Sequence, residues 1–171
     1  MILRHARRRL VTISVTANPT AQWIAGQVID AFPWDEAPRH LLRDRDGAFG
    51  PAYVHRIRAM RIRDHPTAPR SPWQNGLVER LIGSIRRESL DHLIVFNEAQ
   101  LRRVLKNYAS YYNQVRTHLS LEKNAPDLRR PQKLGPIASI SLLGGLHHQY
   151  VRGLGFDYAQ PRSSELDQAV G

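Results

Sequence analysis

The sequence contains no cysteine and very little lysine. The absence of cysteine excludes disulfides, thiolate metal ligands and cysteine nucleophiles. No apolar run approaches the roughly 18 residues that a membrane-spanning helix needs, and Met1 to His5 lack the apolar stretch of a signal peptide. We therefore expect no membrane segment and a reducing compartment, the cytoplasm.

The charge is strongly positive and is carried by arginine. The net charge is +10, and 22 of the 25 basic residues are arginine, because only Lys106, Lys123 and Lys133 are lysines. The planar guanidinium group binds phosphate through two parallel hydrogen bonds, so this composition favours a polyanionic partner. A GC-rich coding sequence would also raise the arginine content. Charge alone therefore favours nucleic acid as the leading candidate partner and does not establish it. The chain has 171 residues, 42% of them hydrophobic, which suffices for one domain with a core.

Strand and helix patterns alternate along the chain. Leu10 to Thr16 is β-branched and alternates with period two, which predicts a strand within an extended segment at 1–17. Asn18-Pro19-Thr20 is a helix-start signal. The further elements expected, in chain order, are a strand at 39–43 ending at Asp44, a short helix at 51–60, a brief strand at 61–63, and helices at about 73–91 and 98–117. This alternation predicts an α/β layered domain.

The two long helices each carry an apolar face. The core stripe of the helix at 73–91 consists of Val78, Leu81, Ile82 and Ile85. The face of the helix at 98–117 consists of Leu101, Val104, Leu105, Tyr108, Tyr111, Tyr112 and Val115. Both stripes predict helices that pack on a core.

The composition shifts toward proline and arginine after Leu121. We therefore expect one domain at 1–121 and a C-terminal extension at 122–171. Within the extension, Ile137 to Val151 predicts a small hairpin with Gly144-Gly145 as its turn. The residues from Ser163 to Gly171 predict a loose tail.

Two carboxylates occupy positions typical of site residues. Asp44 follows a strand, the usual place for a site residue in an α/β sheet. Glu79 lies in the first turns of its helix and off the apolar stripe, on the face that it shares with Asn75, Gly83 and Arg86. Two-metal phosphoryl-transfer sites need several carboxylates from different elements, and Mg²⁺ and Mn²⁺ prefer oxygen ligands. Asp44 and Glu79 are therefore the candidate catalytic residues and metal ligands.

Three segments carry a family resemblance. Ser71-Pro72-Trp73-Gln74-Asn75-Gly76-Leu77-Val78-Glu79-Arg80 resembles the loop and helix start around the third carboxylate of insertion-sequence transposases related to retroviral integrases. Tyr111-Tyr112-Asn113-Gln114-Val115-Arg116-Thr117-His118-Leu119-Ser120-Leu121 is similar to the downstream tyrosine–asparagine–arginine–histidine signature of that group. Leu42-Arg43-Asp44-Arg45-Asp46-Gly47 resembles the strand end with the second carboxylate. Together the segments cover residues 40–121 in the family order.

The resemblance implies a fold, an activity and a set of site residues. The fold is ribonuclease-H-like, a mixed sheet flanked by helices, with an Asp-Asp-Glu triad and Mg²⁺ or Mn²⁺. The implied activity is metal-dependent phosphoryl transfer on DNA during integration or transposition, in the bacterial cytoplasm or on its nucleoid. Glu79 matches the family glutamate and Asp44 the second aspartate, with Asp46 as a rival because Asp-Gly is also an ordinary turn signal. The residues expected to contact DNA are Arg43, Arg45, Arg70, Asn75, Arg80, Arg86, Arg87, Arg116 and His118.

The first aspartate of the family triad has no counterpart on a strand. Upstream of Asp44 the chain has only Asp30, Asp35 and Glu36, which belong to the first expected helix and the turn after it. We interpret Met1–Thr16 as the tail of the second family strand followed by the third, so the first strand is expected to be missing. The chain is then a truncated copy with weak metal binding and weak or absent strand transfer, because triad members act as a unit.

Two further hypotheses accompany this one. A non-catalytic basic remnant would still bind DNA phosphates in a salt-dependent way. An unrelated RNA-binding domain would have no metal site and would use stacking aromatics, and Trp73 is a residue that could either stack on a base or pack against the domain. A homo-oligomer is also considered. No helix-turn-helix or zinc-binding module precedes the core, so we do not expect the chain to recognise specific terminal DNA repeats unaided.

Overall fold

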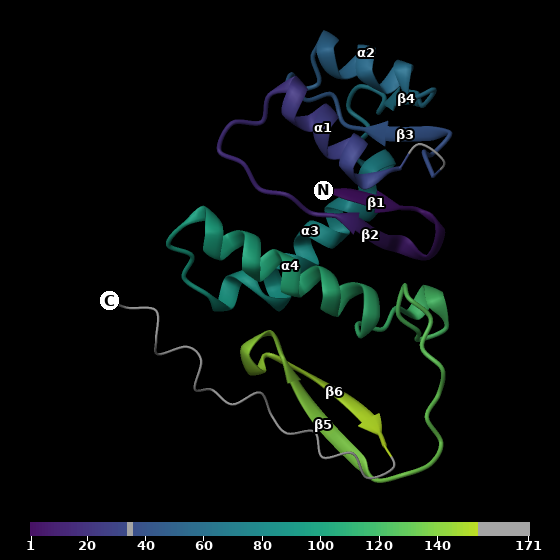
Figure 1. Cartoon of the computed structure of the whole chain (residues 1–171), viewed down its shortest axis with the longest axis vertical. Helices are drawn as coiled ribbons and strands as arrows, with labels where there is room; N and C mark the ends of the chain where they lie inside the picture. The colour runs from purple at the N-terminus through teal and green to yellow at the C-terminus, as the bar shows by residue number, and fades with distance from the viewer. Residues whose placement is uncertain (34–35, 154–171) are drawn as a thin grey trace. The chain divides into compact units, whose positions relative to one another are not determined.

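The structure, a computed structural model, describes residues 1–33 and 36–153 and has two compact units, Met1–Arg129 and Arg130–Gly171 (Figure 1). Asp35, weighed above as a carboxylate, and the expected tail at 163–171 lie outside the described residues. Helices and strands alternate, which confirms the mixed α/β class. Among the described residues, no helix is both long and apolar enough to cross a membrane.

The strands of the first unit form two separate pairs. β1 (Ile2–Arg4) and β2 (Arg9–Thr12) form an antiparallel hairpin. β3 (His40–Arg43) and β4 (Arg63–Pro66) pair in parallel. Within the described residues β1 and β3 do not pair with each other, so no single sheet spans the unit. The ribonuclease-H-like arrangement therefore stays a prediction.

Two helices cover the parallel pair. α1 (Ala21–Ala31) begins where the sequence predicts, because the Thr20 hydroxyl accepts a hydrogen bond from the backbone N–H of Trp23 over 3.2 Å. α2 (Pro51–Ala59) has its proline in the first turn, where the missing N–H costs nothing. It also forms the crossover that a parallel pair requires. The buried core of this region consists of Ala25, Val28, Phe32, Tyr53, Ile57, Met60 and Ile62.

Two strand predictions are corrected in position. The strand expected at 61–63 lies two residues later, because Arg61 adopts a φ of 59° that interrupts extended backbone. The strand expected over Leu10–Thr16 ends at Thr12. Thr12 is opposite Ile2, the first residue of β1, so the residues after Thr12 have no partner in the hairpin.

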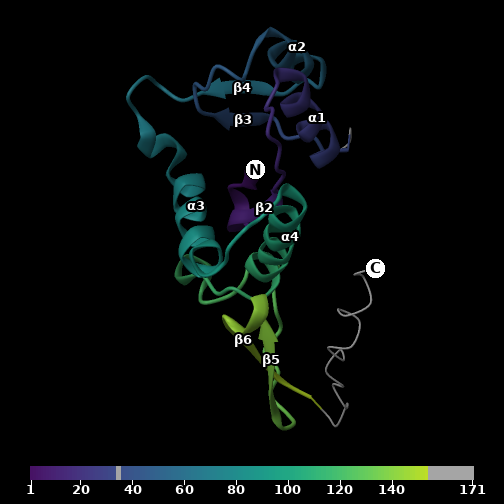
Figure 2. The ribbon, with the colours of Figure 1, turned by 90° about the vertical axis from the view of Figure 1, so that its left-hand side faces the viewer.

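α3 (Gly76–Glu88) and α4 (Glu98–Gln114) lie on either side of the β1–β2 hairpin (Figure 2). The helix expected from residue 73 begins at Gly76, because Pro72–Asn75 forms a 3-10 turn instead. Leu81 and Ile85 are buried as predicted, whereas Ile82 is exposed. On α4 the predicted apolar face contains the buried residues Leu105, Tyr108 and Tyr112. The sequence thus predicts which face of each helix packs better than it predicts where a helix starts.

The second unit contains the expected hairpin. β5 (Ile137–Leu142) and β6 (His147–Arg152) pair in antiparallel register from Ile137 opposite Arg152 to Leu142 opposite His147. Gly144 and Gly145 lie in the connecting turn with φ values of 69° and 94°, a region that favours glycine.

Candidate functional site

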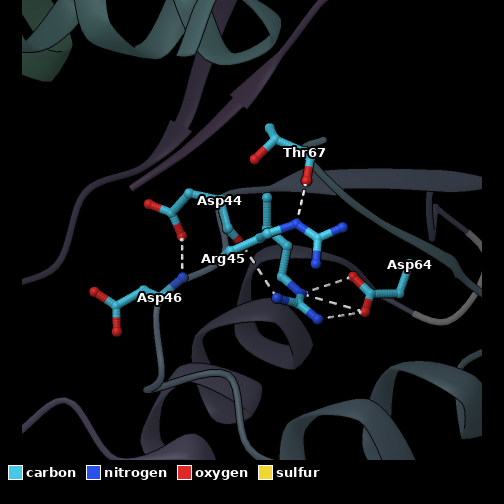
Figure 3. Close-up of polar contacts among 6 residues, drawn as sticks. Asp44, Arg45, Asp46, Asp64 and Thr67 are labelled. Carbon is cyan, nitrogen blue, oxygen red and sulfur yellow. Dashed lines mark hydrogen bonds and ion pairs between the residues drawn. The ribbon is translucent and has the colours of Figure 1, made fainter. Parts of the chain in front are cut away.

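The turn after β3 holds the two candidate aspartates, Asp44 and Asp46, which are both exposed (Figure 3). The backbone N–H of Asp46 donates to Oδ1 of Asp44 over 3.3 Å, and that of Ala48 donates to Oδ1 of Asp46 over 2.8 Å. Both carboxylates therefore stabilise the turn that leads to α2. Asp44 is held less tightly than Asp46, which leaves it the better available of the two for a ligand.

Arg43 is engaged inside the protein. Its guanidinium group pairs with Asp64 at 2.9 Å, and the two side chains are only 13% and 14% exposed. The same group lies 4.7 Å from the centre of the Phe49 ring. Arg43 therefore ties β3 to β4 and to the start of α2. Sequence reasoning expected a DNA contact here and did not single out Asp64, the residue whose charge Arg43 neutralises.

The loop before α3 is fixed by local hydrogen bonds. The side-chain oxygen of Gln74 accepts the backbone N–H of Ala68 over 2.7 Å, and Arg45 Nε donates to the carbonyl of Thr67 over 2.6 Å. Trp73 is 72% exposed, so it does not pack against the domain. The 3-10 turn ends at Asn75, which is partly buried, and Glu79 follows in the first turn of α3, exposed to solvent.

A cavity of about 380 Å³ lies between the β1–β2 hairpin, α1, β3 and the start of α3. Asp44 and Asn75 both line it, so the strand end and the helix start that carry the family-like motifs meet at one place. Glu79 does not line this cavity. It follows Asn75 by four positions, in the first turn of α3, and is exposed.

Strands β1 and β3, which do not pair with each other, border a mostly apolar space. A second cavity, of about 510 Å³, is lined like the first by Ile2 of β1 and by Leu41 and Leu42 of β3. Both cavities are also lined by Asn75 and Val78. The edges of β1 and β3 that face this space have no strand partner in the described residues.

The carboxylates of the described residues do not form a complete metal centre. Within residues 1–33 and 36–153 there is no group of three or more acidic or imidazole side chains that could hold a metal ion. Asp44, Asp46 and Glu79 carry the oxygen donors that Mg²⁺ and Mn²⁺ prefer. A two-metal site needs several such groups to converge, so the described donor set does not fit it.

The arginines of α3 are exposed. Arg80 is exposed, and Arg86 is exposed with its Nε 3.9 Å from Asp91. Arg87 folds back over Gly83, where an added Cβ would lie 3.0 Å from its Nη1. Gly83 thus makes room for Arg87, not for an approaching ligand backbone. Arg70 is exposed in the preceding loop, at a φ of 57°.

Arg116 and His118 belong to a partly buried polar network. Glu88 accepts hydrogen bonds from Nη2 of Arg116 at 2.6 Å and from the hydroxyl of Tyr108 at 2.8 Å. The hydrogen bond to Glu88 raises the pKa of Arg116, and burial together with the bond to Glu88 raises that of Tyr108. His118 is 7% exposed, and its burial lowers its pKa, with the charges of Arg116 and Arg8 acting in the same direction. The network joins α3 to the end of α4.

Asn113 links α4 to β2. Its side chain accepts the backbone N–H of Leu10 over 2.9 Å and donates to the carbonyl of Leu10 over 2.8 Å. The amide group therefore pairs with β2 as a neighbouring strand would. The tyrosine–asparagine–arginine–histidine segment thus contains residues that hold the hairpin, α3 and α4 together, a role that sequence reasoning did not assign to Asn113.

Residues 60–126 match the family model described as the integrase core domain. The matched region contains β4, α3 and α4, and with them Glu79, Arg116 and His118, but it begins after Asp44. It covers less than half of the chain and supports an integrase-core relationship for that part. No curated protein matches the chain.

Proposed function

We propose that this chain is a DNA integration or transposition protein of the integrase-core type, weak or inactive in strand transfer. One observation carries the proposal. Asp44 at the end of β3 and Asn75 at the start of α3 line one cavity, and Glu79 is one turn further along the helix. The match to the integrase core domain over residues 60–126, which include α3, supports the same assignment.

DNA is the proposed partner because basic groups surround this helix. Arg70, Arg80 and Arg86 are exposed, and the chain carries a net charge of +10. Exposed guanidinium groups bind backbone phosphates and release counterions, so affinity should fall steeply with salt. Arg43 is engaged with Asp64 and Arg116 with Glu88, so we assign the phosphate contacts to the exposed arginines first.

The proposed chemistry needs more than the described carboxylates. Asp44 and Glu79 are proposed as two members of the metal-binding set, in which Mg²⁺ or Mn²⁺ would polarise a phosphate and activate an attacking oxygen. Because no group of three or more acidic or imidazole side chains in the described residues could hold a metal ion, the metal should bind weakly. A DNA-binding protein with little or no turnover is what these residues support.

Binding of a fluorescent duplex DNA, followed by anisotropy over a range of salt concentrations, tests the proposal. We expect log K to fall linearly with log salt, and Arg86→Gln to reduce the slope by about 1. Arg58→Gln is the matched control, because it removes the same charge from an exposed position on α2. A DNA affinity that does not change with salt concentration would contradict the proposal. So would an equal change of the salt slope in Arg86→Gln and Arg58→Gln. A clear preference for single-stranded RNA over duplex DNA would favour the RNA-binding alternative.

A further inference from the structure

A small cavity with several polar residues in its wall lies where the β1–β2 hairpin, α3 and the end of α4 meet. Its volume is about 40 Å³, and it is separate from the larger cavity that Asp44 lines. Three arginines from three different segments line it, which is an unusual concentration of one charge sign around a small space. The polar residues of its wall are Arg8, Arg80, Ser84, Tyr112, Arg116 and His118.

The wall contains a buried donor without an acceptor. Nη1 of Arg116 lies 3.3 Å from Nδ1 of His118, and because a guanidinium group can only donate, Nδ1 must accept. The neutral ring then carries its proton on Nε2. That atom is buried and has no hydrogen-bond partner, although the nearby carbonyl of Tyr112 weakly raises the pKa of the ring. A buried N–H group without an acceptor is costly, so a ligand oxygen at this point would be stabilised.

The cavity also carries uncompensated positive charge. The charge of Arg116 is balanced by Glu88, which it contacts at 2.6 Å. The guanidinium groups of Arg8 and Arg80 have no hydrogen-bond or ion-pair partner in the part of the chain that the structure describes. Ser84 is buried and accepts from Arg116 over 3.4 Å, which leaves its own hydroxyl proton free to donate. Arg8, Arg80 and Ser84 can therefore donate to an anion at this cavity.

The hairpin turn holds Arg8 in place at some conformational cost. Arg7 and Arg8 both have positive φ values, 56° and 55°, where asparagine or glycine is usual. Arg7 donates to the carbonyls of Pro126 at 2.7 Å and Ala125 at 2.8 Å, which fixes the turn. With the turn fixed, Arg8 lines the cavity together with Arg80 of α3.

We propose that this cavity binds one phosphate group, held by the guanidinium groups of Arg8 and Arg80, with the buried ring of His118 in its wall as a reporter of binding. The volume accommodates about three water-sized oxygen atoms, given that one water needs roughly 10–15 Å³, so a phosphate group with its four oxygens would enter only in part. It is too small for a nucleobase, so it recognises the phosphate and not the sequence that carries it. The inference does not rest on the proposed strand-transfer function, because inorganic phosphate is a sufficient probe.

The test is a titration of the ¹⁵N-labelled whole chain with inorganic phosphate at constant ionic strength, observing the Nε2 resonance of His118. We expect a saturable shift, absent when chloride replaces phosphate. Arg8→Gln should weaken the binding at least tenfold, and Arg80→Gln provides a second variant should the hairpin turn not tolerate the first. Arg58→Gln on α2 should bind like the parent chain.

Two results would overturn the proposal. A resonance that does not respond to phosphate would indicate that the cavity holds water only. A response that survives both Arg8→Gln and Arg80→Gln would place the anion elsewhere. A short single-stranded oligonucleotide, added in competition, then separates the sources. If it displaces phosphate, the ligand is a nucleic-acid backbone; if it does not, the ligand is a free phosphate.

Discussion

At the scale of single residues, the most consequential side chain is one that no motif reading singled out. Glu88 is the acceptor for both Arg116 and the hydroxyl of Tyr108, and the Arg116 and Glu88 side chains are only 23% and 22% exposed. The sequence places Glu88 nine residues after Glu79 on the same helix, where it resembles any solvent-facing acid. Its importance depends on Arg116, which is 28 positions away and reaches it only once the chain has folded.

Removing the charge of Glu88 should destabilise the fold. Glu88→Gln leaves Arg116 partly buried without a counter-charge, and we expect a loss of about 2–3 kcal/mol in the free energy of unfolding, reduced from the fully buried case by the remaining exposure. Urea denaturation measures it. Glu98→Gln breaks an exposed ion pair with Arg102 and should cost about 0.5 kcal/mol. Equal losses would show that Arg116 does not depend on Glu88.

His118 should make the stability depend on pH below neutrality. Burial lowers its pKa in the folded chain, with Arg116 and Arg8 acting in the same direction and Glu88 opposing them. As the pH falls below the ordinary value of 6.5, the unfolded chain binds the proton first, so stability decreases by up to about 1.4 kcal/mol per pH unit.

Urea unfolding between pH 8 and pH 5 in phosphate-free buffer checks this dependence. His118→Gln should flatten the acid side of the curve relative to the parent chain. His55→Gln, an exposed residue on α2, should leave the curve unchanged. If His118→Gln keeps the full acid dependence, the histidine is not the group responsible.

At the scale of elements, helix faces were predictable and strand pairing was not. The buried Leu105, Tyr108 and Tyr112 follow from the helical spacing of apolar residues, and the start of α1 follows from its Thr20 cap. Strand pairing depends on residues far apart in the sequence. The position of β4 was wrong by two residues because Arg61 takes a left-handed conformation that its side chain does not signal.

Asn113, in the tyrosine–asparagine–arginine–histidine segment, has a structural role as the link between α4 and β2. Its side chain satisfies both backbone groups of Leu10, which is 2% exposed. Asn113→Ala should therefore cost about 2 kcal/mol of unfolding free energy, because a buried N–H and a buried C=O lose their partners. Gln114→Ala, on the exposed side of the same helical turn, should change stability by less than about 0.5 kcal/mol. A loss no larger for Asn113→Ala than for Gln114→Ala would show that α4 does not need this link to β2.

At the scale of the whole molecule, the elements that carry the two candidate carboxylates were predictable, and the described residues do not complete a metal centre around them. Sequence spacing placed Asp44 after a strand and Glu79 off the apolar stripe of a helix, and the structure has Asp44 at the end of β3 and Glu79 exposed on α3. Sequence could not predict that Arg43 and Arg116 would be engaged by Asp64 and Glu88, because both partners come from other elements. The apolar space between β1 and β3, which do not pair with each other, could not be predicted from local patterns either.

The most direct measurement is Mn²⁺-dependent nicking of duplex DNA by the whole chain, compared with Glu79→Ala and with the Arg58→Gln control. A strand cut needs a full set of converging carboxylates, and the described residues do not provide it. We predict that the chain binds the DNA and that nicking stays at or near the level seen without protein. Robust Mn²⁺-dependent nicking that Glu79→Ala abolishes and Arg58→Gln preserves would contradict it, because the carboxylate set would then be complete.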